Sequence, residues 1–204
     1  IPPGDGAFIA KDNNGTGYGD GGYLYVSYYD AAIASELTVF MAEPASNYNR
    51  IYQHDPLGET YYLVVPQAKP GVPAASHAAN VFTSAGDDYL AAVGFFKSWC
   101  DTTDEVDYRI HIHLDPPAGS PAGAPGGKVR RLPAASVKLV LPGYYTVRLP
   151  HKIPLKKGQR FSVVLSGHRT GDGNGATVAI EKPMFECSTA EAHAGESFVS
   201  ADGI

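Results

Sequence analysis

Two cysteines and seven histidines are the side chains that could supply a nucleophile and its base in this 204-residue chain. A cysteine nucleophile needs a histidine nearby and a setting, often the first turn of a helix, that lowers the pKa of the thiol. Cys100 lies in Ser-Trp-Cys-Asp and Cys187 in Phe-Glu-Cys-Ser, and neither segment is glycine-rich or typical of a helix start. We therefore expect no catalytic thiol. The two cysteines can form one disulfide or stay as two buried thiols, and the sequence leaves both alternatives open.

Metal ligands are a second kind of chemistry that the residue types allow. His111 and His113 lie two apart on one face of a predicted strand and could hold a metal ion, but no third ligand is identifiable, so we expect two solvent-facing histidines. Acidic residues in or beside predicted turns could bind calcium, but such residues are usually only solvated, so a structural calcium ion stays open and no other cofactor is expected. These residues are Asp55, Asp87, Asp88, Asp101, Asp104, Glu105 and Asp172.

A glycine-rich segment, residues 15–22, resembles two kinds of binding loop without fitting either. Its Gly-x-Gly-x-x-Gly spacing matches a dinucleotide fingerprint, but the residues from Tyr23 onward are typical of a strand, so no helix N-terminus is available for a pyrophosphate. A calcium loop of the EF-hand type is also excluded, because the twelfth position counted from Asp12 is Tyr23 where glutamate is needed. We expect these glycines to form a tight turn between strands at 7–10 and 23–29.

The elements that must position these side chains are predicted to be strands. The 23 glycines and 16 prolines would interrupt long helices, while most aromatic residues lie in runs that also hold Val, Ile and Thr. Ten short apolar runs without a convincing helix indicate a sandwich or barrel. They cover residues 37–42, 50–53, 61–65, 80–83, 90–97, 106–114, 137–141, 144–149, 160–166 and 177–181.

Alternation with a period of two is clearest in the run at 106–114. Tyr108, Ile110, Ile112 and Leu114 alternate with polar residues, so we expect one buried face and one solvated face. The Pro/Gly/Ala-rich stretch at 116–127 has no side chains able to build a core and is predicted to be a loop between strands.

Charge and hydropathy exclude two classes of partner. The formal net charge is −5, and no cluster of Lys and Arg exceeds short pairs, so we expect no nucleic-acid partner. No apolar run reaches the roughly 18 residues of a membrane helix, so no membrane span is expected. The chain begins with Ile-Pro-Pro, without an initiator Met or a signal peptide, and is expected to be part of something longer.

The first residues, read as a whole, resemble the segment around the third catalytic residue of papain-like cysteine peptidases. That family pattern is Lys-Asn-Ser-Trp-Gly-x-x-Trp-Gly-x-x-Gly-Tyr. The positions that match it are Lys11, Gly15, Gly19, Gly22 and Tyr23. The resemblance implies that Asp12 stands where the family has the Asn that orients the catalytic imidazole, with Asn14 and Tyr18 in place of the two Trp residues. It also implies that the catalytic Cys and His precede this segment in the parent protein and are missing here.

The rest of the chain resembles the lectin-like domain that is appended to papain-like peptidases of bacterial and archaeal cell surfaces. The segments that carry this resemblance are 28–30, 51–58, 79–82, 91–95, 143–147, 157–164 and 195–203. It implies an all-β, jelly-roll-like β-sandwich, residues 34–204, preceded by a β-hairpin arm, residues 1–33, left from the peptidase domain. It also implies a secreted or cell-surface location and an upstream peptidase domain as partner.

Two functions follow from these resemblances, and the sequence does not choose between them. The module binds envelope glycan or a surface protein, or it only positions and stabilises the peptidase domain; in either case we expect no proteolysis by this chain alone. Sugar binding needs an aromatic platform with polar groups beside it. The candidates are Tyr52, His54, Asp55, Tyr61, Tyr62, Trp99, Tyr144 and Tyr145, most of which we expect to serve the core or strand pairing.

Overall fold

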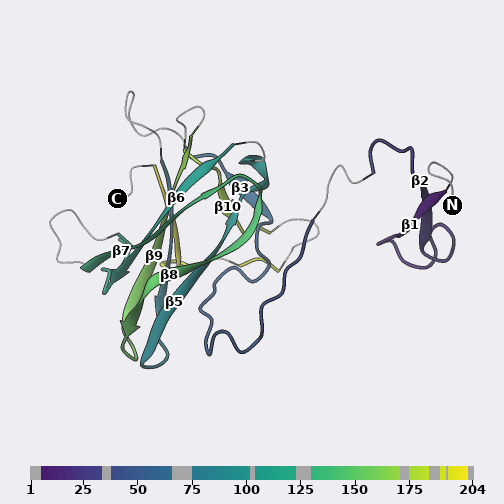
Figure 1. Cartoon of the computed structure of the whole chain (residues 1–204). Coiled ribbons are helices and arrows are strands. Elements are labelled where there is room, and N and C mark those ends of the chain that lie inside the picture. The colour runs from purple at the N-terminus through teal and green to yellow at the C-terminus, as the bar shows by residue number, and fades with distance from the viewer. Residues whose placement is uncertain are drawn as a thin grey trace. The chain divides into compact units, whose positions relative to one another are not determined.

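The chain is an all-β protein with an N-terminal β-hairpin and a β-sandwich, as the sequence predicted (Figure 1). The computed structural model describes residues 6–33, 38–65, 75–101, 104–122, 130–170, 175–183, 189–191 and 193–201. It divides into two compact units, Ile1–Arg50 and Ile51–Ile204. The domain boundary expected between residues 33 and 34 stays a prediction. Among the described residues, no helix is long and apolar enough to cross a membrane.

The first unit contains the predicted hairpin. Strands β1 (Ala7–Lys11) and β2 (Tyr23–Ser27) pair antiparallel with Phe8 opposite Val26. The loop between them needs glycine at position 19, because its φ is +58° and an added Cβ would lie 2.3 Å from the carbonyl oxygen of Tyr23. Asp12 directly follows β1, where the loop of the hairpin begins. Its backbone N–H donates to the Gly22 carbonyl at 2.8 Å.

The second unit is built from antiparallel sheets. One sheet has five strands in the order β11-β4-β9-β6-β7, a second pairs β5 with β8, and a third pairs β10 with β3. A 3-10 turn, η1 (Trp99–Asp101), follows β5. The strands are β3 (Tyr61–Leu63), β4 (Ser76–Thr83), β5 (Asp88–Lys97), β6 (Val106–Leu114), β7 (Arg130–Leu139), β8 (Gly143–Leu155), β9 (Arg160–Arg169), β10 (Val178–Ile180) and β11 (Ser197–Ser200).

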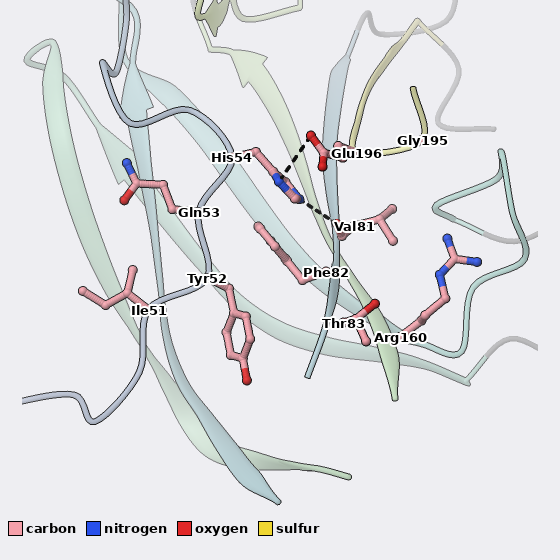
Figure 2. A pocket seen from close by; sticks show the side chains of 10 residues that line it. All are labelled: Ile51, Tyr52, Gln53, His54, Val81, Phe82, Thr83, Arg160, Gly195 and Glu196. Carbon is pink, nitrogen blue, oxygen red and sulfur yellow. Dashed lines mark hydrogen bonds and ion pairs between the residues drawn. The ribbon is translucent and has the colours of Figure 1, made fainter. Parts of the chain in front are cut away.

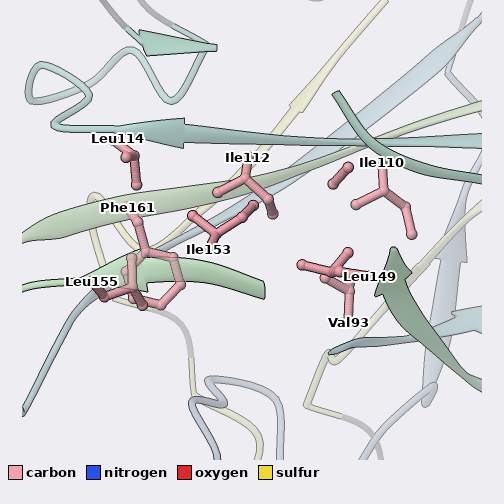
Figure 3. Packing of buried hydrophobic residues seen from close by; sticks show 9 residues of the cluster. Val93, Ile110, Ile112, Leu114, Leu149, Ile153, Leu155 and Phe161 are labelled. Atoms are coloured by element: carbon pink, nitrogen blue, oxygen red, sulfur yellow. The ribbon is translucent and has the colours of Figure 1, made fainter. Parts of the chain in front are cut away.

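The core lies between the five-stranded sheet and the β5–β8 pair (Figure 3). The predicted apolar face of β6 is buried, since Ile110, Ile112 and Leu114 pack with Leu149 of β8 and Phe161 of β9. Burying such a row of aliphatic side chains is the main force that holds two sheets together. The alternation of apolar and polar residues in β6 thus predicted correctly which face of the strand is buried in the core.

The opposite face of β6 is only partly solvated, which corrects the expectation for His113. Its side chain is 4% exposed, because residues 115–122 fold back over this face. His113 bonds the backbone of Ala122, and the hydroxyl of Ser162 donates to the carbonyl of Pro121. The described part of the predicted loop, residues 116–122, therefore covers the sheet; residues 123–127 lie outside the described ranges.

Two predicted strands, 37–42 and 50–53, are wrong as far as the structure describes them. Residues 38–42 form no strand and have no partner strand, and Phe40 is 90% exposed. Residues 50–53 are irregular, although Tyr52 still reaches the core. Strand β11 and the second half of β8 were not predicted from the sequence. In β8, Pro150 and Pro154 conceal the strand pattern.

Candidate functional site

An open pocket of about 400 Å³ lies beside the end of β4 (Figure 2). The irregular segment 51–54 forms one side, residues 81–83 of β4 form the floor, and the first residue of β9 and the residues just before β11 complete it. Its lining residues are Ile51, Tyr52, Gln53, His54, Val81, Phe82, Thr83, Arg160, Gly195 and Glu196.

His54 is fixed in this pocket by three contacts. Its ring stacks on the ring of Phe82, with centroids 4.5 Å apart and planes 7° apart. Nε2 lies 2.7 Å from the carbonyl oxygen of Val81, so Nε2 must carry a proton and donate. Nδ1 faces a carboxylate oxygen of Glu196 at 3.5 Å, a contact that becomes an ion pair when the imidazole is protonated. The ring is therefore held as a rigid, flat wall.

Tyr52 anchors the irregular segment and leaves no free hydroxyl for a ligand. Its hydroxyl donates to Asp88 at 3.0 Å and accepts the backbone N–H of Ala85 at 3.1 Å. The ring packs edge-on against Phe161 with centroids 5.3 Å apart. Tyr52 thus positions its neighbour His54 while its own polar atom is already satisfied.

The arrangement suits binding by contact and hydrogen bonding. It offers a ring surface beside the polar side chains of Gln53, Thr83, Arg160 and Glu196. The described lining contains no cysteine and so offers no thiol nucleophile.

Only two of the eight aromatic and polar candidates from the sequence, Tyr52 and His54, line this pocket. The sequence missed Phe82, Thr83, Arg160 and Glu196, because they come from three separate segments and no short motif joins them. Asp55 lies close by and accepts a hydrogen bond from Asn80 at 3.3 Å.

The other aromatic candidates are elsewhere. Tyr62 stacks with Tyr61 and meets Trp99 edge-on, each at 5.2 Å between centroids. Tyr144 lies against Phe96, and Tyr145 donates to the carbonyl of Leu141. These rings make their contacts outside the pocket, and Tyr61, Trp99 and Tyr144 are exposed.

The acidic candidates for calcium do not converge within the described residues, where no group of three or more ligating side chains is placed to hold a metal. Asp101 is buried and accepts hydrogen bonds from Thr177. Asp87 accepts from the backbone of Lys157, Asp88 from Tyr52, and Glu105 from Lys138. Asp104 lies 3.5 Å from Arg169. Asp172 lies outside the described residues.

The histidine pair on β6 is also engaged by protein groups. A guanidinium nitrogen of Arg131 lies 2.7 Å from Nε2 of His111, so that nitrogen is an acceptor and cannot also bind a metal. Partial burial, together with the Arg131 charge, lowers the pKa of His111 to about 4. Burial, with a smaller contribution from Arg131, likewise lowers the pKa of His113.

This geometry predicts acid destabilisation. Because the folded-state pKa of His111 lies at about 4, below its ordinary value of 6.5, its contribution is complete above pH 6.5 and is lost as pH falls toward 4. We expect the midpoint of thermal unfolding to fall over this window, by the equivalent of about 1–2 kcal/mol from this group after allowance for its partial exposure.

The His111→Gln variant, which cannot be protonated, should show a smaller fall between pH 7 and pH 4. His151, which is exposed on β8, provides the matched control His151→Gln, whose pH dependence should equal that of the parent chain. An unchanged pH dependence in His111→Gln would contradict the role assigned to this imidazole.

Asp12, the position predicted for the third catalytic residue, is half-buried just after β1. One carboxylate oxygen accepts hydrogen bonds from both the backbone N–H and the side-chain amide of Asn14, each at 2.7 Å. Among the described residues the second oxygen has no partner. The catalytic role of Asp12 stays a prediction. Cys100 carries a free, partly buried thiol, which favours the alternative of unpaired cysteines; Cys187 lies outside the described residues.

Comparisons with known proteins bear on both parts of the chain. A family model described as "Lectin like domain" matches residues 51–204. A solved structure of the clostridial cysteine protease Cwp84 after propeptide cleavage matches with a TM-score of 0.62 and 21% identity over 99% of this chain. A structure of the cysteine protease and lectin-like domains of Cwp84, a surface layer associated protein of Clostridium difficile, matches with a TM-score of 0.57 and 19% identity over 99% of this chain.

The chain spans 47% and 42% of the length of these two structures, and at such identities the likeness shows a shared fold. The likeness in fold covers the hairpin as well as the sandwich. Curated proteins gave no match. The resemblance to a lectin-like domain that the sequence suggested is confirmed.

Proposed function

Because this chain belongs to the lectin-like domain family through residues 51–204, we propose that it is an accessory module of a cysteine peptidase that binds a cell-envelope glycan in the pocket beside β4. The flat stack of His54 on Phe82, set in a pocket of about 400 Å³, carries this proposal. A sugar ring has one apolar C–H face and a rim of hydroxyl groups, so it needs a flat apolar wall with hydrogen-bonding groups around it.

The polar groups of the pocket complement such a rim. Gln53 and Thr83 are exposed and carry an amide and a hydroxyl, which can both donate and accept hydrogen bonds. Glu196 adds a carboxylate acceptor. Because Nε2 of His54 donates to the Val81 carbonyl and Nδ1 faces the Glu196 carboxylate, the residue contributes mainly its ring face.

Proteolysis by this chain alone is not part of the proposal. Asp12 stands at the position of the family's catalytic Asn, and without the catalytic Cys and His its carboxylate has no imidazole to orient. In the parent protein its unpaired oxygen could accept the N–H of a catalytic imidazole, as the family's Asn does. The parent enzyme is accordingly proposed to be a cysteine endopeptidase that is secreted or held at the cell surface, a location supported by the description of Cwp84 as surface layer associated.

The proposal is tested by measuring the binding of the chain to a panel of purified envelope glycans. The variants His54→Ala and Thr83→Val should weaken binding, with about a tenfold or larger loss for His54→Ala because the stacking wall is removed. His151→Ala alters an exposed histidine outside the pocket and should bind like the parent chain. Thermal unfolding of each variant checks that the fold is retained.

Two outcomes would contradict glycan binding in this pocket. If the parent chain binds no glycan of the panel, the alternative function, a domain that only positions or stabilises the peptidase, is favoured. If it binds but His54→Ala binds equally well, the ligand occupies another surface. Hydrolysis of a peptide substrate by the chain would contradict the assignment of Asp12 as a single triad member.

A further inference from the structure

Arg160 places a positive charge in the lining of the candidate pocket. It is the first residue of β9, pairs with Thr83 across the sheet, and its carbonyl accepts the N–H of Asp115 at 2.8 Å, so its backbone is fixed. The side chain is partly buried and lines the pocket. Figure 2 draws it on one side of the pocket, with Ile51 and Tyr52 on the other.

The guanidinium of Arg160 has no protein partner among the described residues. No carboxylate oxygen there lies within 4.0 Å of its nitrogens, and no acceptor is hydrogen-bonded to it. Arg169, by contrast, lies 3.5 Å from both Asp101 and Asp104. A partly buried guanidinium with five N–H donors and no acceptor is a group prepared for an external anion.

The pocket's own carboxylate does not neutralise this charge. Glu196 is directed to His54, at 3.5 Å from Nδ1, and lies beyond ion-pair distance of Arg160. The Glu196 carboxylate therefore lies beside His54, and the Arg160 guanidinium is left for the ligand. The net charge of the chain is −5, so its overall electrostatic field disfavours anions. An arginine without a protein partner gives this pocket a local preference for anions despite that field.

We propose that Arg160 binds an anionic group on the sugar that occupies the pocket, so that the ligand is an acidic glycan. The shared chemistry is a carboxylate or a phosphate, since both present two oxygens that fit the guanidinium in a bidentate manner. This inference rests on the proposed glycan-binding function and names the ligand class for that site. The hexose ring lies on the His54–Phe82 wall, and the acidic substituent reaches the Arg160 side.

The test compares three oligosaccharides with the same N-acetylhexosamine backbone: one neutral, one carrying carboxylates and one carrying phosphates. Dissociation constants are measured at low and high salt for the parent chain, Arg160→Gln, Arg160→Lys and the control Arg148→Gln. Arg148 is exposed on β8 and lies outside the pocket. Tighter binding of the carboxylated or of the phosphorylated glycan identifies the source of the negative charge.

The parent chain should bind at least one acidic oligosaccharide about tenfold more tightly than the neutral one, and high salt should reduce this preference. Arg160→Gln should lose the preference, so that the acidic and neutral oligosaccharides bind with similar affinity, and Arg160→Lys should keep part of it, because a point charge remains without the fork. Arg148→Gln should behave like the parent chain.

The two proposals fail in different ways. Equal binding of all three oligosaccharides, unchanged in Arg160→Gln, would overturn the acidic-ligand inference and leave glycan binding intact. Failure of the parent chain to bind any of the three would overturn both. An acidic preference that Arg148→Gln abolishes to the same degree would also overturn the inference, since the charge would then act from the general surface.

Discussion

Replacing Asp101 with alanine is expected to destabilise the sandwich by about 3–5 kcal/mol, because the change breaks a buried network of charged and polar groups. Asp101 is 0% exposed. Its carboxylate accepts the backbone N–H of Thr177 at 2.7 Å and the hydroxyl of Thr177 at 2.9 Å, and it lies 3.5 Å from Arg169. The buried amine of Lys97 donates to the backbone carbonyl of the same residue. Without the carboxylate, Thr177 and Arg169 lose their shared acceptor.

Chemical denaturation of the parent chain and of Asp101→Ala measures this loss as a shift in the denaturant midpoint. Asp104→Ala is the matched control, because Asp104 also lies 3.5 Å from Arg169 but is 39% exposed, and we expect it to cost less than about 1 kcal/mol. Equal midpoints for the parent chain and Asp101→Ala would show that the network does not hold η1 against the start of β10.

Replacing Phe161 with alanine is expected to cost about 3–5 kcal/mol, because a large side chain that is 1% exposed would leave a cavity in the core. The same ring supports the pocket from below, with its centroid 5.3 Å from that of Tyr52 and 5.5 Å from that of Phe82. We therefore expect both a lower unfolding free energy and weaker ligand binding.

The conservative variant Phe161→Leu separates these effects, since it fills most of the cavity and should cost less than half as much stability. Denaturant unfolding gives the stability, and glycan binding below the unfolding transition gives the affinity. Stability of Phe161→Ala within 1 kcal/mol of the parent chain would contradict the position of this ring at the centre of the core.

The fold could be predicted where the sequence has a strict period. The predicted and the observed bounds of β6 are both 106–114, because Tyr108, Ile110, Ile112 and Leu114 are all buried, the last three in the main core and Tyr108 in a second cluster. Strand β11 could not be found, because Ser-Phe-Val-Ser is too short to show a period and depends on pairing with β4. The error for His113 has the same origin, since the segment that covers it comes from outside the strand.

The site was predicted in part for a related reason. Tyr52 and His54 were candidates because aromatic and polar residues adjoin in one segment. Phe82 and Arg160 became pocket residues only through the register of β4 and β9, in which Thr83 pairs with Arg160. Such long-range pairing is not visible in a local pattern, so the charge of the pocket could not be inferred from the sequence.

The measurement that tests the account most directly is an NMR titration of the isotope-labelled chain with an acidic envelope oligosaccharide. We expect saturable shift changes concentrated at the pocket residues His54, Phe82, Thr83, Arg160 and Glu196, and their loss in His54→Ala. Saturable changes centred instead on Trp99 and Tyr61, or the absence of any change at millimolar ligand, would contradict a glycan site in this pocket.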